Sequence, residues 1–92
     1  MFLKIRSFFK LLIALEKAKA FLNKYRAINT REKMYDLMSE AWETKNPQRL
    51  LQYMMNYEEW TKEKKRYEAL PTEAEKEESL KRIMALQNKI FI

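Results

Sequence analysis

The sequence predicts an all-α protein, a compact antiparallel bundle of three to four helices with a long N-terminal amphipathic helix. Three observations predict this fold class. The 92 residues include no Gly, so the residue that most easily adopts positive φ in hairpin turns is missing. Leu, Lys, Glu, Met and Ala, which favour helices, are abundant. Apolar residues recur at spacings of three and four, as on one face of a helix.

The first helix is predicted over residues 2–27, and its apolar pattern changes along its length. In residues 1–15 large apolar side chains occupy most of the helix circumference, with three basic residues and no acid before Glu16. From residue 16 onward the apolar positions narrow to a stripe. That stripe consists of Ala18, Phe21, Leu22 and Tyr25. A bundle groove that buries the stripe leaves part of the wider arc uncovered, so residues 2–15 carry surplus apolar surface.

The second helix is predicted over residues 30–45, with Asn29 or Thr30 as its N-cap. Its apolar face is expected to consist of Met34, Leu37, Met38 and Ala41, with Tyr35 and Trp42 at the edge.

The third helix is predicted over residues 47–69, because Asn46 is a favoured N-cap and Pro47 suits a first helical position. Its apolar stripe is expected to face the core. The stripe consists of Leu50, Tyr53, Met54, Tyr57, Trp60 and Tyr67.

The fourth helix is predicted over residues 72–90. Thr72 and Glu75 have the spacing of a capping box, and Pro71 interrupts the preceding helix. Its apolar stripe is expected to consist of Leu80, Ile83, Met84, Ile90 and Phe91.

No internal repeat or flexible linker divides the chain, so residues 1–92 are predicted to form a single domain. The absence of His removes the commonest general base and metal ligand, and the absence of Cys removes thiol nucleophiles, zinc thiolates and disulfides. We therefore expect no enzymatic activity, no cofactor, no metal site and no catalytic residue.

The positive charge is concentrated in the first third of the chain. Residues 1–33 contain nine basic and two acidic residues, whereas the remainder contains ten basic and eleven acidic residues. Attraction to an acidic protein, an anionic lipid or a nucleic acid is therefore expected to reside in residues 1–33. Nucleic-acid binding, as in a small ribosomal or phage-encoded protein, is the alternative function that this charge suggests.

Several alternatives remain for residues 1–15. The longest uninterrupted apolar run is Leu11–Leu15, too short for a transmembrane span, and Lys10 with Glu16 disfavours a secretory signal peptide. A retained mitochondrial targeting segment, a membrane-surface helix, and a helix buried by a partner protein or by a second copy of the chain stay open. We expect an intracellular protein that is not secreted, and a mitochondrial or a membrane-peripheral location stays open.

The tripeptide Lys24-Tyr25-Arg26 resembles the Leu-Tyr-Arg sequence of the small helical LYR-motif proteins of mitochondria, which serve as accessory subunits and assembly factors. The first residue differs, and the tripeptide lies near the end of its predicted helix instead of the start. No residue role is carried over from that family.

The function predicted from these patterns is that of a non-enzymatic interaction protein, a small accessory subunit or regulator of a larger assembly. It would dock on a protein partner or a membrane face through its N-terminal helix. The predicted docking residues are Phe2, Ile5, Phe8, Phe9, Leu12 and Ile13. The predicted electrostatic contacts are Lys4, Arg6, Lys10, Lys17, Lys24 and Arg26.

Overall fold

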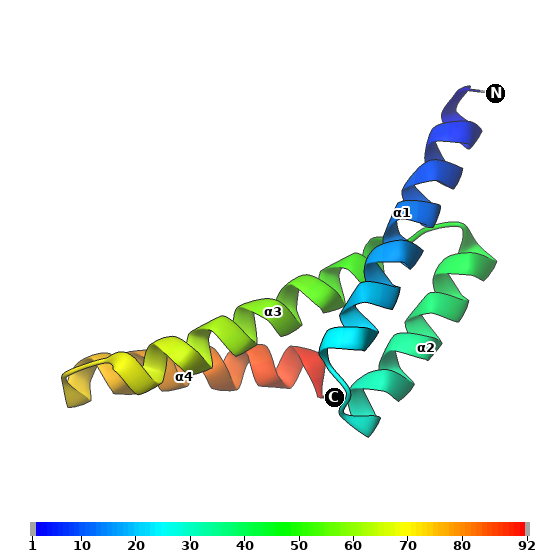
Figure 1. Ribbon diagram of the computed structural model, residues 1–92. Coiled ribbons are helices and arrows are strands. Elements are labelled where there is room, and N and C mark those ends of the chain that lie inside the picture. The colour runs from blue at the N-terminus through cyan, green and yellow to red at the C-terminus, as the bar shows by residue number, and fades with distance from the viewer. Residues whose placement is uncertain (1, 92) are drawn as a thin grey trace. The chain divides into compact units, whose positions relative to one another are not determined.

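The computed structural model describes the backbone of residues 2–91 and the side chains of residues 6 and 8–91. Within this part of the chain there are four α-helices and no strand (Figure 1). The helices are α1 (Phe2–Lys24), α2 (Ile28–Thr44), α3 (Gln48–Ala69) and α4 (Glu73–Ile90). The predicted all-α class, with its long N-terminal helix, is confirmed.

The chain divides into two compact units, Met1–Met54 and Met55–Ile92, and the division falls inside α3. The N-terminal unit contains α1, α2 and the first turns of α3. The C-terminal unit contains the rest of α3 and α4. The single domain predicted over residues 1–92 stays a prediction.

In the N-terminal unit α1 and α2 form an antiparallel pair joined by residues 25–27 (Figure 1). Small side chains, Ala14 and Ala18 on α1 and Ala41 on α2, are fully buried, and such residues allow two helix backbones to approach closely. The start of α3 contributes Tyr53, whose ring centroid lies 6.4 Å from that of Phe21. The larger buried apolar residues of this unit are Leu11, Phe21, Leu22, Met34, Leu37, Leu50, Tyr53 and Met54.

In the C-terminal unit α3 and α4 pack antiparallel through an aromatic cluster. The Phe91 ring lies edge-on to Tyr57 and Trp60, at centroid distances of 6.3 Å and 5.1 Å. Ile83 and Ile90 of α4 are buried. The predicted α4 stripe is therefore only partly correct, because Leu80, Met84 and Phe91 are exposed.

Two of the predicted helix starts are confirmed by their hydrogen bonds. The backbone N–H of Gln48 donates to Asn46 Oδ1 at 3.1 Å, and the backbone N–H of Glu75 donates to Thr72 Oγ1 at 3.3 Å. These side chains satisfy backbone donors that the first turn of a helix leaves unpaired.

The predicted cap of the second helix is wrong. α2 begins at Ile28, preceded by Ala27 in an extended conformation with no side-chain cap. Thr30 is fully buried within α2 instead of starting it, so packing overrides the capping preference of this residue. The first helix also ends earlier than predicted, at Lys24.

Candidate docking surface

One side of α1 is buried in the N-terminal unit and the other is open. Leu11, Ala14 and Ala18 have no exposed surface, which fixes the side of α1 that faces the core. Around the rest of the circumference the side chains of residues 8–13 are large and apolar except for Lys10. The change from a wide to a narrow apolar arc, predicted from the sequence, therefore produces an exposed apolar surface.

The α1 apolar strip consists of Phe8, Phe9, Leu12 and Ile13, whose exposed fractions are 46%, 58%, 39% and 55%. At about 100° per residue, Phe8 and Ile13 lie about 140° apart around the helix axis, with the other two side chains between them. Large apolar residues this exposed and this close together mark a site of interaction more often than an isolated exposed Leu or Phe does.

Positive charge lines one edge of this strip. Arg6, Lys10 and Lys17, which we call the basic edge, are exposed and project within about 60° of Ile13 around the helix. Glu16, at the C-terminal end of the strip, is the only acidic residue in the sequence of α1. Its Oε1 lies 3.3 Å from Lys19 Nζ. The strip and the basic edge together make a surface that is apolar in the middle and cationic on one side.

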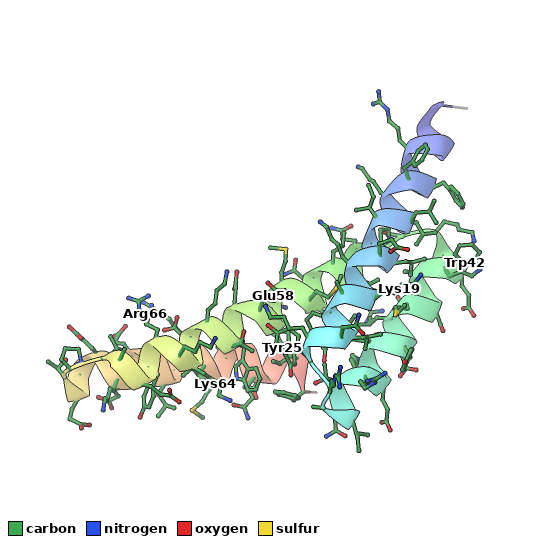
Figure 2. All side chains as sticks on the ribbon, in the orientation of Figure 1. Lys19, Tyr25, Trp42, Glu58, Lys64 and Arg66 are labelled. Carbon is green, nitrogen blue, oxygen red and sulfur yellow. The ribbon has the colours of Figure 1, made fainter. Side chains whose placement is uncertain are left out.

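A shallow hollow lies on the other side of the strip, where α1 meets α2. It is lined by Leu15, Tyr35, Met38, Ser39, Trp42 and Glu43. Leu15 is about 20° from Phe8 around α1, so the hollow extends the apolar surface onto α2. Trp42 of α2 is half exposed (Figure 2). Lys45 Nζ lies 3.8 Å from the centre of its ring.

Not all of the predicted contacts gather at this surface. Lys24 lies about 16 Å along the helix from Ile13, at about 1.5 Å per residue. Arg26 follows the end of α1, where its Nε donates to the Asn23 carbonyl at 3.4 Å. The structure therefore separates Lys24 and Arg26 from the apolar strip. Phe2, Lys4 and Ile5 belong to α1, but their side chains lie outside the described residues.

Sequence reasoning placed Tyr35 and Trp42 at the edge of an apolar face but did not include them in the site. Their exposure beside Leu15 makes them candidates for the same surface. The available signal was the i, i+7 spacing of two aromatics at one edge of a helix. Spacing alone does not tell which edge lies next to the exposed part of α1.

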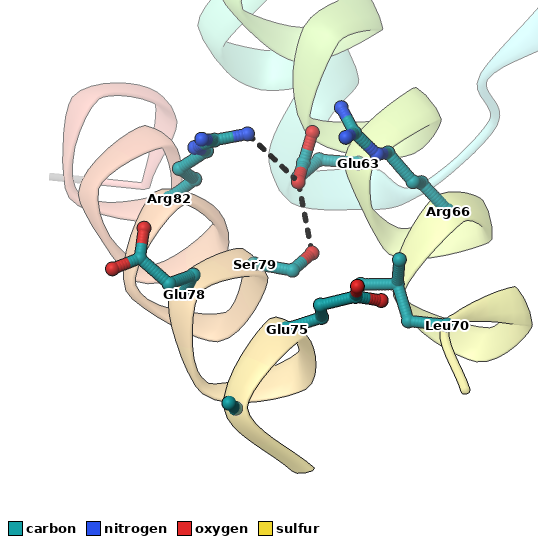
Figure 3. A pocket seen from close by; sticks show the side chains of 8 residues that line it. Glu63, Arg66, Leu70, Glu75, Glu78, Ser79 and Arg82 are labelled. Carbon is teal, nitrogen blue, oxygen red and sulfur yellow. Dashed lines mark hydrogen bonds and ion pairs between the residues drawn. The ribbon is translucent and has the colours of Figure 1, made fainter. Parts of the chain in front are cut away.

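A polar pocket lies between α3 and α4 of the C-terminal unit (Figure 3). The Ser79 hydroxyl donates to Glu63 Oε1 at 2.8 Å, and Arg82 approaches the same oxygen at 3.9 Å. The hydrogen bond from Ser79 to Glu63 links α4 to α3. Because Ser79 and Glu63 pair with each other across α3 and α4, the geometry favours a structural role for the pair.

The aromatic residues of α3 face the interior of the protein, as their spacing predicts. Tyr53 and Tyr57 are buried, and Trp60 and Tyr67 are partly buried. Buried rings are not accessible for stacking on bases, which weighs against a nucleic-acid surface built on this stripe.

No protein-family model, curated protein or solved structure matches the chain. None of the helices in the described part is long and apolar enough to cross a membrane. Across those same residues, no group of three or more His, Cys, Asp or Glu is placed to hold a metal ion.

Proposed function

We propose that this protein is a non-enzymatic interaction protein, a small accessory subunit or regulator that attaches to a larger structure through α1. The exposure of the α1 apolar strip carries this proposal. Complete burial of a Phe, Leu or Ile side chain contributes about 1.5–3 kcal/mol. The four strip residues are 39–58% exposed, so roughly half of that contribution is left for each to gain when a partner covers it.

The basic edge indicates the charge of the surface to which α1 attaches. Arg6, Lys10 and Lys17 lie beside the strip, whereas Glu16 at its end is bound to Lys19. The surface that receives α1 is therefore expected to combine apolar area with negative charge. Complementary charge of this kind accelerates encounter and fixes orientation, while the apolar contact supplies most of the affinity.

The test is whether the chain is attached to something larger in cells that make it, and whether the strip is responsible. We expect the tagged intact chain to sediment with large assemblies after gentle lysis. Replacing two strip residues, Phe9→Asp with Ile13→Asp, should reduce the sedimenting fraction at least about ten-fold, because charged side chains cannot be buried there.

A matched control replaces two equally exposed apolar residues of the C-terminal unit, Met55→Asp with Met84→Asp. It introduces the same charge and removes a similar exposed area, so it should sediment like the intact chain. The proposal is wrong if the intact chain runs as a free small protein, or if the strip variant sediments as the intact chain does.

A further inference from the structure

We propose that the surface receiving α1 is an anionic lipid bilayer, with the α1 apolar strip in the acyl boundary and the basic edge among the headgroups. This inference rests on the proposed function, which requires only that α1 attaches to something. The occupant is a phospholipid surface with negative headgroups.

The width of the strip favours a bilayer over a protein groove. Phe8 and Ile13 lie about 140° apart around α1, and this exposed arc comes in addition to the side that is already buried, whereas a stripe of about 100° is enough for a helix to pack in one groove. The interface between the headgroups and the acyl chains of a bilayer is a continuous surface. It can therefore cover the whole apolar arc of a helix that lies in its plane. Phe9 and Ile13, the most exposed of the four, project farthest from the buried side.

The position of the charges matches such a surface. Arg6, Lys10 and Lys17 are exposed beside the strip, where long basic side chains can reach the headgroups while the strip enters the acyl boundary. Each basic residue near an anionic leaflet strengthens binding, and interfacial helices carry these residues next to their apolar face.

Trp42 supplies a second, independent observation. Its half-exposed ring lines the hollow that continues the apolar surface from Leu15, and Lys45 Nζ lies 3.8 Å from the ring centre. A Trp ring has an apolar body and a polar N–H, and it is enriched at the level of the headgroups. The strip therefore has cations along one edge and, along the other, an interfacial aromatic of α2 with Glu43 beside it.

A nucleic acid would use the cations but not the strip. Phosphate contacts need basic side chains, and they leave Phe9, Leu12 and Ile13 in water with no favourable partner. An occupant that uses both the apolar and the cationic features is therefore the better match.

The experiment measures binding of the purified full chain to unilamellar vesicles by co-sedimentation. Vesicles of phosphatidylcholine and phosphatidylglycerol, mixed at about 2:1, are compared with vesicles of phosphatidylcholine alone. We expect binding to the anionic vesicles that is at least about ten-fold tighter than binding to the neutral ones. In a Trp60→Phe chain, Trp42 emission should shift to the blue on binding.

Two variants test the two halves of the surface. Phe9→Asp with Ile13→Asp should weaken binding to anionic vesicles at least about ten-fold. Lys10→Glu with Lys17→Glu should do the same, because each reversal removes an attraction and adds a repulsion. Circular dichroism of each variant establishes that its helices are intact.

Each variant has a control of equal chemistry elsewhere in the chain. Met55→Asp with Met84→Asp matches the first, and Lys62→Glu with Lys65→Glu matches the change in net charge of the second. All four of these residues are exposed in the C-terminal unit, so both controls should bind within about two-fold of the intact chain.

Three results would overturn the inference. The first is no vesicle binding by the intact chain; if that chain still sediments with large assemblies in cells and the Phe9 and Ile13 variant does not, the proposed function survives with an occupant other than a lipid surface. The second is binding that the Lys10 and Lys17 variant loses but the Phe9 and Ile13 variant keeps, which indicates a general polyanion site such as one for nucleic acid. The third is equal loss in the Lys62 and Lys65 control, which would trace binding to net charge alone.

Discussion

A chain without Gly must place another residue where its backbone takes a positive φ. Among the described residues that position is Lys45, which follows the end of α2 with φ of 57° and ψ of 27°. The left-handed conformation costs a residue with a Cβ roughly 1 kcal/mol. Lys45 recovers part of this cost, because its ammonium group lies over the Trp42 ring and such a contact contributes about 0.5–1 kcal/mol at an exposed site.

Substitution at Lys45 separates these two effects. Lys45→Ala loses the contact with Trp42 and keeps the backbone strain, so it should lower the free energy of unfolding by about 0.5–1 kcal/mol. Lys45→Gly loses the same contact but relieves the strain, so it should be about 1 kcal/mol more stable than Lys45→Ala. Urea unfolding of the three proteins measures the differences. Equal stability of the Ala and Gly variants would show that the backbone at this position is not strained.

At the scale of the helix, the sequence predicts the buried side of an element better than the extent of its burial. The narrow stripe after Glu16 identified Ala18, Phe21 and Leu22, all buried. In α4 the same reasoning grouped Leu80 and Met84 with Ile83, yet only Ile83 is buried. Apolar periodicity gives a direction around a helix, whereas the width of the buried arc depends on how closely and at what angle the neighbouring helix crosses.

The exposed strip of α1 could be predicted because its arc is wider than any one neighbour can cover. The hollow beside it could not, because it depends on the register of α2 against α1.

The packing of α3 against α4 depends on one buried hydroxyl as well as on apolar contacts. Ser79 is buried and donates to Glu63, whose side chain is 15% exposed. Ser79→Ala removes the donor and leaves the shielded carboxylate poorly satisfied, so we expect a loss of about 1–2 kcal/mol in the free energy of unfolding. Arg82 is 57% exposed and 3.9 Å away, so Arg82→Ala should cost less than about 0.5 kcal/mol. Thermal unfolding of the two variants gives the comparison. A larger cost for Arg82→Ala would assign the link between the helices to the ion pair instead of the hydroxyl.

At the scale of the whole molecule, the two compact units share one continuous helix and each contains one Trp. Trp42 lies in the N-terminal unit and Trp60 in the C-terminal unit. α3 runs across the division, and a helix is cooperative along its length. Because neither unit has a large core of its own, we expect the chain to unfold as the single domain predicted from its sequence.

The two tryptophans allow this expectation to be tested with one mild substitution. Trp60→Phe leaves Trp42 as the only reporter, and Trp42→Phe leaves Trp60. Ile83→Val in the C-terminal unit removes one buried methyl group, which typically costs about 0.5–1.5 kcal/mol. If residues 1–92 unfold together, this substitution lowers the urea midpoint reported by Trp42 by as much as the midpoint reported by Trp60. A midpoint that falls for Trp60 and stays unchanged for Trp42 would show two independently unfolding units. In that case the α1 surface would belong to a module that folds without the C-terminal half of the chain.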